Sequence, residues 1–181
     1  MSLSFSARDL TVCSLGAALL TLCSWLTVPA AVPFTMQSFA VCLLAALLGR
    51  RLALCTFALY LLLGVIGLPV FSGFHNGAAV LLGPTGGYLL GFFLTVLCVG
   101  FAADRSNRHP AALAWSIFFG MLLCYACGTL WFVVVYTHSS GEIGVGTALS
   151  LCVLPFLLPD GIKCALALLL AKRLRPILDW G

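Results

Sequence analysis

Uncharged apolar segments of unusual length determine the fold class of this chain. Residues 10–49, 52–103 and 109–141 contain no Asp, Glu, Lys or Arg. A helix needs about 20 apolar residues to cross the hydrocarbon core of a bilayer, so each segment can hold at least one crossing. Charged residues make up 8% of the chain, whereas soluble domains contain about 25%. Because the apolar runs are continuous, not alternating, they exclude barrel strands and predict an all-α integral membrane protein.

Pro, Gly and charged residues divide these segments into six predicted transmembrane helices, which form a single domain over residues 1–181. The first is too long for the core of a signal peptide and lacks a convincing cleavage site, so we expect it to be retained. The second is short and is expected to be tilted. The predicted helices are residues 9–28, 36–48, 52–67, 86–103, 111–136 and 155–174.

The distribution of basic residues predicts the orientation of the helices. The connections 29–35, 68–85 and 138–154 contain no Lys or Arg, whereas the other connections and the two ends contain eight of the nine. Positively charged loops stay on the cytoplasmic side. Both termini are therefore predicted to be cytoplasmic, and the irregular connections to be external. The eight residues are Arg8, Arg50, Arg51, Arg105, Arg108, Lys172, Arg173 and Arg175.

An acid and an amine interrupt the apolar sequence of the last predicted helix. Asp160 and Lys163 are three residues apart, so they lie on one face of a helix. A charge at the bilayer centre costs roughly 3 kcal/mol on insertion scales, and a buried ion pair contributes little to stability that apolar packing would not provide. The pair therefore predicts a binding or transport site near the midplane or in the outer half of the membrane. The alternative is a salt bridge that only neutralises itself.

The connection before the fourth predicted helix is too apolar for a solvated loop and too rich in Gly and Pro for a helix. Non-helical backbone at membrane depth is tolerated where it is buried in protein or lines a cavity, so residues 68–85 are predicted to cover a pocket. Phe71 would supply an apolar wall, and glycines such as Gly73 let the backbone approach a ligand. The amide of Asn76 can both donate and accept hydrogen bonds. The alternative is an ordinary turn with Asn76 at the surface.

Two further residues complete the predicted pocket. Gln37 brings one amide group to the start of the second helix, and Tyr88 provides a ring that can stack on a ligand. The alternatives are a helix cap for Gln37 and a place in the interfacial aromatic belt for Tyr88. With Asn76, Asp160 and Lys163 they suit a small molecule that has an apolar body, an amide-like head and a negative charge.

Other functional classes lack their characteristic residues. The sequence contains no phosphate-binding loop, no His-Glu-x-x-His motif and no Ser/His/Asp set. Its nine cysteines are scattered through apolar runs, which is typical of small packing residues. Cys124 and Cys127 have the spacing of metal ligands but no second pair. We therefore expect no enzyme activity, catalytic residue, metal or cofactor, and no nucleic acid partner.

Small residues lie on one face of the first predicted helix, where Ser14 and Ala18 are four positions apart. Such a face lets another helix approach closely. From the residues alone, the approaching helix could belong to a partner protein or to the same bundle.

Four groups of residues, in order along the chain, carry a resemblance to a known family. They are VPFTMQ at 32–37 with FAV at 39–41, YLLLGVIGLPVF at 60–71, GPTGGYLLGF at 83–92 and PFLLPDGIK at 155–163. With these segments the chain resembles the BioY family, the biotin-specific substrate-binding (S) components of energy-coupling factor (ECF) transporters. The resemblance implies a six-helix S-component fold in a bacterial cytoplasmic membrane, with biotin bound from outside.

The same resemblance implies roles for individual residues. Asp160 would accept from a ureido N–H of biotin, Asn76 would donate and accept, and Lys163 would donate to the ureido carbonyl or the valerate carboxylate. Ser14 and Ala18 would face a transmembrane coupling protein that works with two cytoplasmic ATPases. A homo-oligomer without that module is a second possibility. The alternative function is a self-sufficient carrier for a small carboxylate vitamin that needs no ATPase module.

Overall fold

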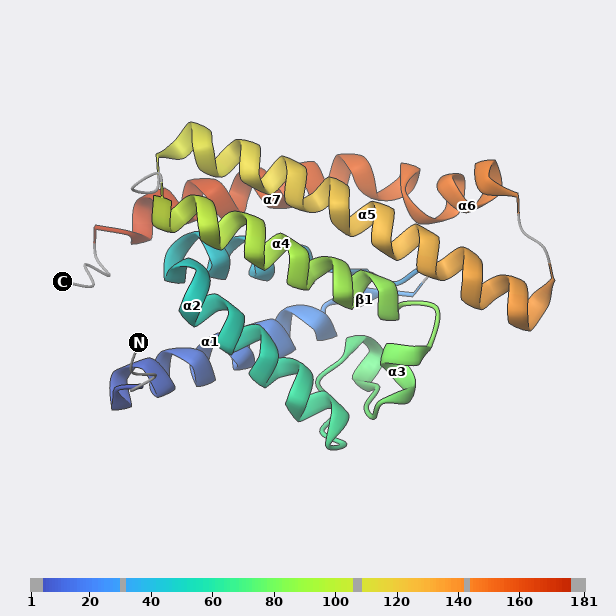
Figure 1. The fold of residues 1–181 in the computed structure, drawn as a ribbon, viewed down its shortest axis with the longest axis horizontal. Helices are drawn as coiled ribbons and strands as arrows, with labels where there is room; N and C mark the ends of the chain where they lie inside the picture. The colour runs from blue at the N-terminus through green and yellow to red at the C-terminus, as the bar shows by residue number, and fades with distance from the viewer. Residues whose placement is uncertain (1–4, 30–31, 106–108, 142–143, 177–181) are drawn as a thin grey trace.

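Long apolar helices make up most of the structure, a computed structural model that describes residues 5–29, 32–105, 109–141 and 144–176 (Figure 1). Among these residues, five helical segments are long and apolar enough to cross a membrane, which confirms the predicted all-α membrane class. The long helices are α1 (Ala7–Trp25), α2 (Gln37–Val65), α4 (Gly86–Arg105), α5 (Pro110–Ser140) and α7 (Leu154–Leu174).

Helix α2 is interrupted at Gly49, where the sequence predicts a break. Gly49 has a φ of 74°, a left-handed conformation that glycine adopts without steric penalty. Leu44 and Thr56, on either side of the break, both lie within 3.5 Å of the position of a Cβ built on Gly16. In a straight helix these two residues would be about 18 Å apart along the axis. The two halves of α2 therefore fold back on each other, as the ribbon also shows (Figure 1).

Helix α4 lies between α2 and α5 and packs against both. A Cβ on Gly91 would lie 2.6 Å from the Cα of Cys124 on α5, and a Cβ on Gly100 would lie 2.6 Å from the Cα of Arg50 on α2. Membrane helices commonly use small residues to bring their backbones this close. These contacts fix the helices that surround the candidate site.

The three predicted external connections contain short regular elements, which the sequence did not indicate. A two-stranded antiparallel hairpin follows α1, two helical turns separate α2 from α4, and a two-turn helix precedes α7. Backbone groups away from water must be satisfied internally, which favours hydrogen-bonded turns even where Pro and Gly break long helices. The elements are β1 (Thr27–Val28), β2 (Phe34–Thr35), η1 (Ser72–Phe74), α3 (Ala79–Leu82) and α6 (Val145–Cys152).

Helix ends differ from the predicted ones by a few residues. Helix α5 continues to Ser140, beyond the predicted end at residue 136, because no helix-breaking residue occurs before Gly141, which has a φ of 100°. Helix α1 begins earlier than predicted, at a capping box in which Ser6 and Asp9 bond each other's backbone N–H groups. Arg108, in the predicted polar loop, lies outside the described residues.

Two tryptophans hold the connection between α2 and α4. Trp25 Nε1 on α1 donates to the carbonyl of Pro69 at 2.8 Å, and Trp131 Nε1 on α5 donates to the carbonyl of Gly83 at 2.9 Å. The connection is thereby tied at both ends to neighbouring helices, on the side of the bundle away from the termini (Figure 1).

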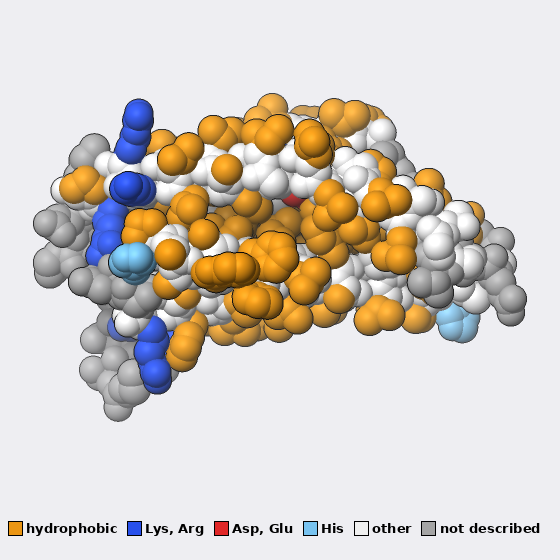
Figure 2. Space-filling model, turned by 90° about the horizontal axis from the view of Figure 1, so that it is seen from above, with side chains coloured by type: hydrophobic (Ala, Val, Ile, Leu, Met, Phe, Trp, Pro, Cys, Tyr) orange, Lys and Arg blue, Asp and Glu red, His pale blue; other side chains and the backbone are white. Residues whose placement is uncertain are grey.

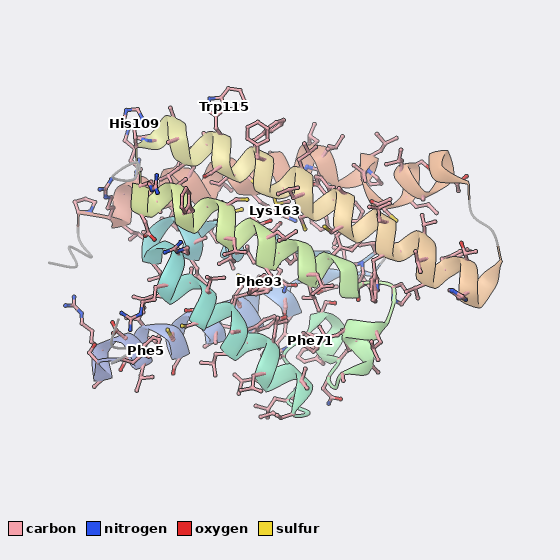
Figure 3. The ribbon with its side chains drawn as sticks, viewed as in Figure 1. Phe5, Phe71, Phe93, His109, Trp115 and Lys163 are labelled. Atoms are coloured by element: carbon pink, nitrogen blue, oxygen red, sulfur yellow. The ribbon has the colours of Figure 1, made fainter. Side chains whose placement is uncertain are left out.

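The surface is apolar along its length and basic at one end. Apolar side chains cover the face seen in Figure 2, and Lys and Arg gather at the end where both termini lie in Figure 1. Trp115 on α5 is 64% exposed and points away from the bundle (Figure 3). An apolar belt of this kind fits the hydrocarbon of a bilayer.

Candidate functional site

A narrow cavity lies where α2, α4, α5 and α7 meet the β2 strand. Four residues predicted to contact a ligand line it, namely Gln37, Tyr88, Asp160 and Lys163. Its volume is about 70 Å³, below the roughly 300 Å³ of the smallest typical ligand pockets, so a vitamin-sized ligand must separate the walls. The other lining residues are Val32, Pro33, Thr35, Ser38, Ser72, Thr85, Leu89, Phe92, Met121, Cys124, Tyr125, Cys152 and Phe156.

Asp160 is the centre of the polar network in this cavity. Its Oδ1 accepts hydrogen bonds from Ser38 Oγ at 2.9 Å and from Lys163 Nζ at 2.8 Å. Its Oδ2 accepts from the hydroxyl of Tyr125 at 2.7 Å. A carboxylate offers about four lone-pair positions, and the donors among the described residues occupy three of them, so one position on Oδ2 can take a ligand. Asp160 therefore joins α7 to α2 and α5 and keeps limited capacity for a further donor.

Lys163 lies in the middle of the bundle (Figure 3) and is 5% exposed. Its ammonium group donates to the carbonyl of Thr35 at 2.6 Å and to Asp160 at 2.8 Å. It also lies 3.5 Å from the centroid of the Phe34 ring, where the ring quadrupole attracts a cation. An ammonium group has three donors, and among the residues that the structure describes only two of them meet an oxygen acceptor, so the third can turn to a ligand. The ring of Phe156 on α7 stacks on the ring of Phe34 on β2, with 5.9 Å between their centroids.

Helix α7 contains a proline beside this ion pair. Pro159 lies inside the helix and has no N–H, so the carbonyl four residues earlier receives no helical hydrogen bond. Gly161 follows Asp160 and has no neighbouring atom within 4 Å of a built Cβ. The sequence Pro-Asp-Gly thus places the buried carboxylate between a residue without an N–H and a residue without a side chain.

Gln37 and Tyr88 add polar groups to the opposite walls. Gln37 is 4% exposed, and its Nε2 donates to the hydroxyl of Tyr60 at 3.3 Å. Among the residues that the structure describes, no donor contacts Gln37 Oε1, so this oxygen can accept from a ligand. The Tyr88 hydroxyl donates to the carbonyl of Cys152 at 3.2 Å and lies 3.4 Å from Thr129 Oγ1. Tyr88 therefore presents mainly its ring to the cavity.

Phe71 lies outside the cavity and belongs to the core beneath the connection. It is 1% exposed, and its ring meets that of Tyr60 edge to face at 5.6 Å. A Cβ on Gly64 would lie 2.1 Å from Phe71 Cζ, so the ring fits against bare helix backbone. In Figure 3, Phe71 is well separated from Lys163.

Gly73 and Asn76 are exposed and do not line the cavity. Gly73 has a φ of 68°, which allows the tight turn of η1. Their neighbour Ser72 does line the cavity, so the connection reaches the site through its backbone near that residue. That Phe71, Gly73 and Asn76 contact a ligand stays a prediction, which requires this connection to move inward.

The BioY family model matches residues 1–179 of the chain. This chain belongs to the BioY family. The biotin transporter BioY of Thermotoga maritima is 38% identical over 94% of this chain and 97% of its own length. The probable biotin transporter BioY of Pyrococcus horikoshii is 34% identical over 93% of this chain and 97% of its own length.

A solved structure has the same fold as this BioY chain. It is the S-component for biotin from an ECF-type ABC transporter, with a TM-score of 0.83 and 26% sequence identity. The match covers 96% of this chain and 95% of that one. As a BioY family member with several membrane-length helices, the chain is a multi-pass membrane protein and not an enzyme.

The site of this BioY protein includes polar residues that sequence reasoning missed. Ser38 and Tyr125 both bond Asp160, and the carbonyl of Thr35 holds Lys163. Ser38 is one of several hydroxyl residues in the apolar segments, and Tyr125 lies in a helix that also contains Ser116 and Thr129. Neither residue stands out in the sequence, because each is identified only by its contact with Asp160.

The residues predicted to meet a partner lie on the outside of the BioY bundle. Ser14 and Ala18 are exposed on α1, and Ser14 Oγ donates to the carbonyl of Leu10 at 2.9 Å. Gly16 and Ala17, on the other face, are buried against the rest of the bundle. The exposed face of α1 is therefore open to another helix, and its role in partner binding stays a prediction.

The arrangement as a whole is suited to binding. One buried acid and one buried amine neutralise each other, so the cavity has no net formal charge, and it retains an open acceptor on Asp160, an N–H on Lys163 and Oε1 of Gln37. Aromatic and aliphatic side chains form its walls. Within the described parts of the chain, no three His, Cys, Asp or Glu side chains are placed to hold a metal ion.

Proposed function

We propose that this chain binds biotin from the external side of the membrane and mediates its uptake as the substrate-binding subunit of an ECF transporter. The observation that carries the proposal is the buried Asp160–Lys163 pair, with a 2.8 Å contact, in a cavity of a BioY family chain. The relatives that match nearly the full chain are a biotin transporter and a probable biotin transporter, and the S-component with the same fold is one for biotin. Family and cavity thus point to the same ligand.

The free groups of the cavity match the chemistry of biotin. A ureido N–H can donate to Gln37 Oε1 or to the open position on Asp160, and the remaining N–H of Lys163 can donate to the ureido carbonyl or to the carboxylate. The thiophane ring and valerate chain would lie against apolar walls that include Phe156 and Leu89. Asn76 would contact the ligand once the connection between α2 and α4 closes over it.

Binding of labelled biotin to the purified chain tests this proposal directly. At a thousandfold excess over its dissociation constant, biotin should stabilise the protein by about 4 kcal/mol. Lipoate, which lacks the ureido ring, should compete weakly. The affinities of the wild type and of Lys163→Met for biotin and for biotin amide identify the group of biotin that Lys163 contacts. If Lys163 binds the carboxylate, the wild type should prefer biotin over the amide, and Lys163→Met should lose that preference. A folded protein that ignores micromolar biotin would exclude the proposed function.

The same proposal includes the membrane topology. The two halves of α2 would cross the bilayer separately, which gives six crossings and a single domain over residues 1–181. The basic end of the bundle would face the cytoplasm of a bacterial cell, with both termini there and the connection between α2 and α4 outside. A C-terminal green fluorescent protein fusion should fluoresce, because this reporter folds in the cytoplasm. A fusion protein that binds biotin but does not fluoresce would place the C-terminus outside the cell, which contradicts the proposed orientation.

The partners proposed for the chain are a transmembrane coupling protein and two cytoplasmic ATPases. The exposed face of α1 with Ser14 and Ala18 would receive the coupling protein, since small residues permit close helix contact. Ala18→Trp should prevent co-purification of that module while biotin binding continues. Leu90→Trp, at an exposed position of α4, is the matched control. Normal assembly of the Ala18→Trp protein would move the interface elsewhere.

Uptake by the isolated chain separates this proposal from the self-sufficient carrier. Vesicles that contain the chain without any ATPase should bind biotin but not accumulate it. Accumulation driven by an ion gradient would favour the carrier. A stable oligomer that transports without the module would favour the homo-oligomeric form.

A further inference from the structure

A second, wider space opens on the outside of the bundle, between α5 and α7. It has a volume of about 480 Å³ and is lined mainly by apolar residues, which include Phe118 and Leu122 on α5 and Ala165 and Leu168 on α7. Figure 2 looks onto this face, where a hollow runs between apolar ridges and acidic colour is visible at its floor. Asp160 is the acidic residue that lines this groove.

The groove leads to the basic end of the molecule. Leu168 also lines a smaller crevice of about 190 Å³ between α2, α5 and α7, and Lys172 and Arg175 form the polar part of that crevice. Leu168 therefore belongs to the wall of both spaces, which follow each other along α7. Together they form a groove-and-crevice channel that runs from an apolar part to two cationic side chains.

The length of this channel matches one leaflet of a bilayer. Gly161 and Lys172, near its two ends, are 11 positions apart on α7, which is about 16 Å along a helix. Half of the roughly 30 Å hydrocarbon core is about 15 Å. A chain whose headgroup lies at the membrane surface would therefore reach the level of Asp160 with its tip.

We propose that this groove binds one acyl chain of an anionic phospholipid, with the headgroup phosphate against Lys172 and Arg175. Basic pockets between membrane helices bind anionic headgroups, and the apolar walls above the two cations match a hydrocarbon chain. The occupant is a bilayer lipid because free phosphate would use only the cations and leave the 480 Å³ groove unexplained. The inference requires the chain to lie in a membrane but does not depend on the identity of the transported ligand.

The bound chain would also form a side wall of the ligand site. Met121, Tyr125 and Asp160 line both the groove and the central cavity, so the acyl tip would lie against the outer side of these residues. Hydrocarbon in that position excludes water from the network around Asp160, which strengthens its hydrogen bonds.

Native mass spectrometry of the purified chain with phosphatidylglycerol or phosphatidylcholine of identical acyl chains tests the proposal. We expect retention of phosphatidylglycerol over phosphatidylcholine, and an approximately fivefold loss of that retention in Lys172→Ala. Arg173→Ala removes the same charge from the next position, outside the crevice, and should leave retention within about twofold of the wild type. Both side chains are exposed, so the variants should fold.

A third variant tests the acyl part of the site. Ala165 is exposed in the groove, and Ala165→Phe should fill it and lower phosphatidylglycerol retention with both cations intact. A melting temperature near that of the wild type would show that this variant folds. Equal retention of the two lipids, equal losses in Lys172→Ala and Arg173→Ala, or no effect of Ala165→Phe would each overturn the proposal. A lipid-free dimer that Ala165→Phe dissociates would instead assign the groove to a second copy of the chain.

Discussion

Replacement of the Asp160–Lys163 pair, singly and together, distinguishes a ligand-binding pair from a structural one. Asp160→Asn keeps an oxygen acceptor at nearly the same position and removes the negative charge. Lys163→Met keeps the approximate length of the side chain. Its sulfur can pack on the Phe34 ring, over which the Lys163 ammonium group lies in the wild type. The double variant removes both charges and leaves Ser38 and Tyr125 with polar partners.

The structure gives the size of the expected effects. At 2.8 Å and an effective dielectric constant of 20, the gross attraction between the charges is about 6 kcal/mol. Removal of one partner from a buried pair typically costs about 3–5 kcal/mol because the other charge is left without compensation. Even 3 kcal/mol corresponds to a fall in melting temperature of about 6–12 °C for a chain of this size. Each single variant should therefore be clearly less stable than the wild type.

The double variant should recover most of the lost stability. Buried pairs replaced by uncharged residues of similar volume are often neutral or stabilising. The amide introduced by Asp160→Asn can still accept from Ser38, and it can donate to the Tyr125 hydroxyl, which then turns to accept. We expect the double variant to lie within about 2 kcal/mol of the wild type, whereas biotin affinity stays at least tenfold weaker, about 1.4 kcal/mol.

Two measurements on each of the four proteins decide the matter: the melting temperature in detergent without ligand, and the dissociation constant of labelled biotin. Stability that recovers without affinity supports a pair that contacts the ligand. If affinity recovers together with stability, the pair only stabilises the bundle. If the double variant is as unstable as the sum of the single variants, the two charges are not coupled and the magnitude derived from their distance is wrong.

Two other substitutions test the surroundings of the site. Gly64→Ala should lower the melting temperature, because its Cβ would lie 2.1 Å from the Phe71 ring and overpacking costs about 1–3 kcal/mol. The control Gly146→Ala, whose Cβ would have no atom within 4 Å, should leave the melting temperature unchanged. Equal melting temperatures of the two variants would contradict this reasoning. Tyr125→Phe removes a 2.7 Å hydrogen bond to Asp160 and should weaken biotin binding by about 1 kcal/mol, roughly fivefold; unchanged affinity in equilibrium binding would remove Tyr125 from the site.

The long helices could be predicted because a bilayer allows few alternatives. Segments without charge that exceed the membrane thickness must be helical, and Gly49 beside two arginines marked the break within α2. The short elements could not be predicted in the same way. Helix α6 has only eight residues, and the order of polar and apolar residues there does not distinguish a two-turn helix from an irregular connection.

The site could be predicted only where a residue is unusual by itself. Asp160 and Lys163 stand out as charges in an apolar segment, and Gln37 as an amide, and all three line the cavity. Ser38 does not stand out, because its role depends on contact with Asp160, 122 positions away. The prediction for Asn76 rests on the composition of its connection, which does not determine where the side chain points.

The position of Asp160 explains why its carboxylate needs three donors. It lines the central cavity on one side and the groove between α5 and α7 on the other. The groove side offers mainly hydrocarbon, which cannot stabilise a charge, so all compensation must come from Ser38, Tyr125 and Lys163. A ligand that takes the open position on Oδ2 therefore binds to a carboxylate already held by α2, α5 and α7. Because the 2.7 Å bond from Tyr125 joins α5 to Asp160 on α7, the proposed lipid chain between these two helices should also alter biotin affinity, and equal affinities with and without phosphatidylglycerol would contradict this coupling.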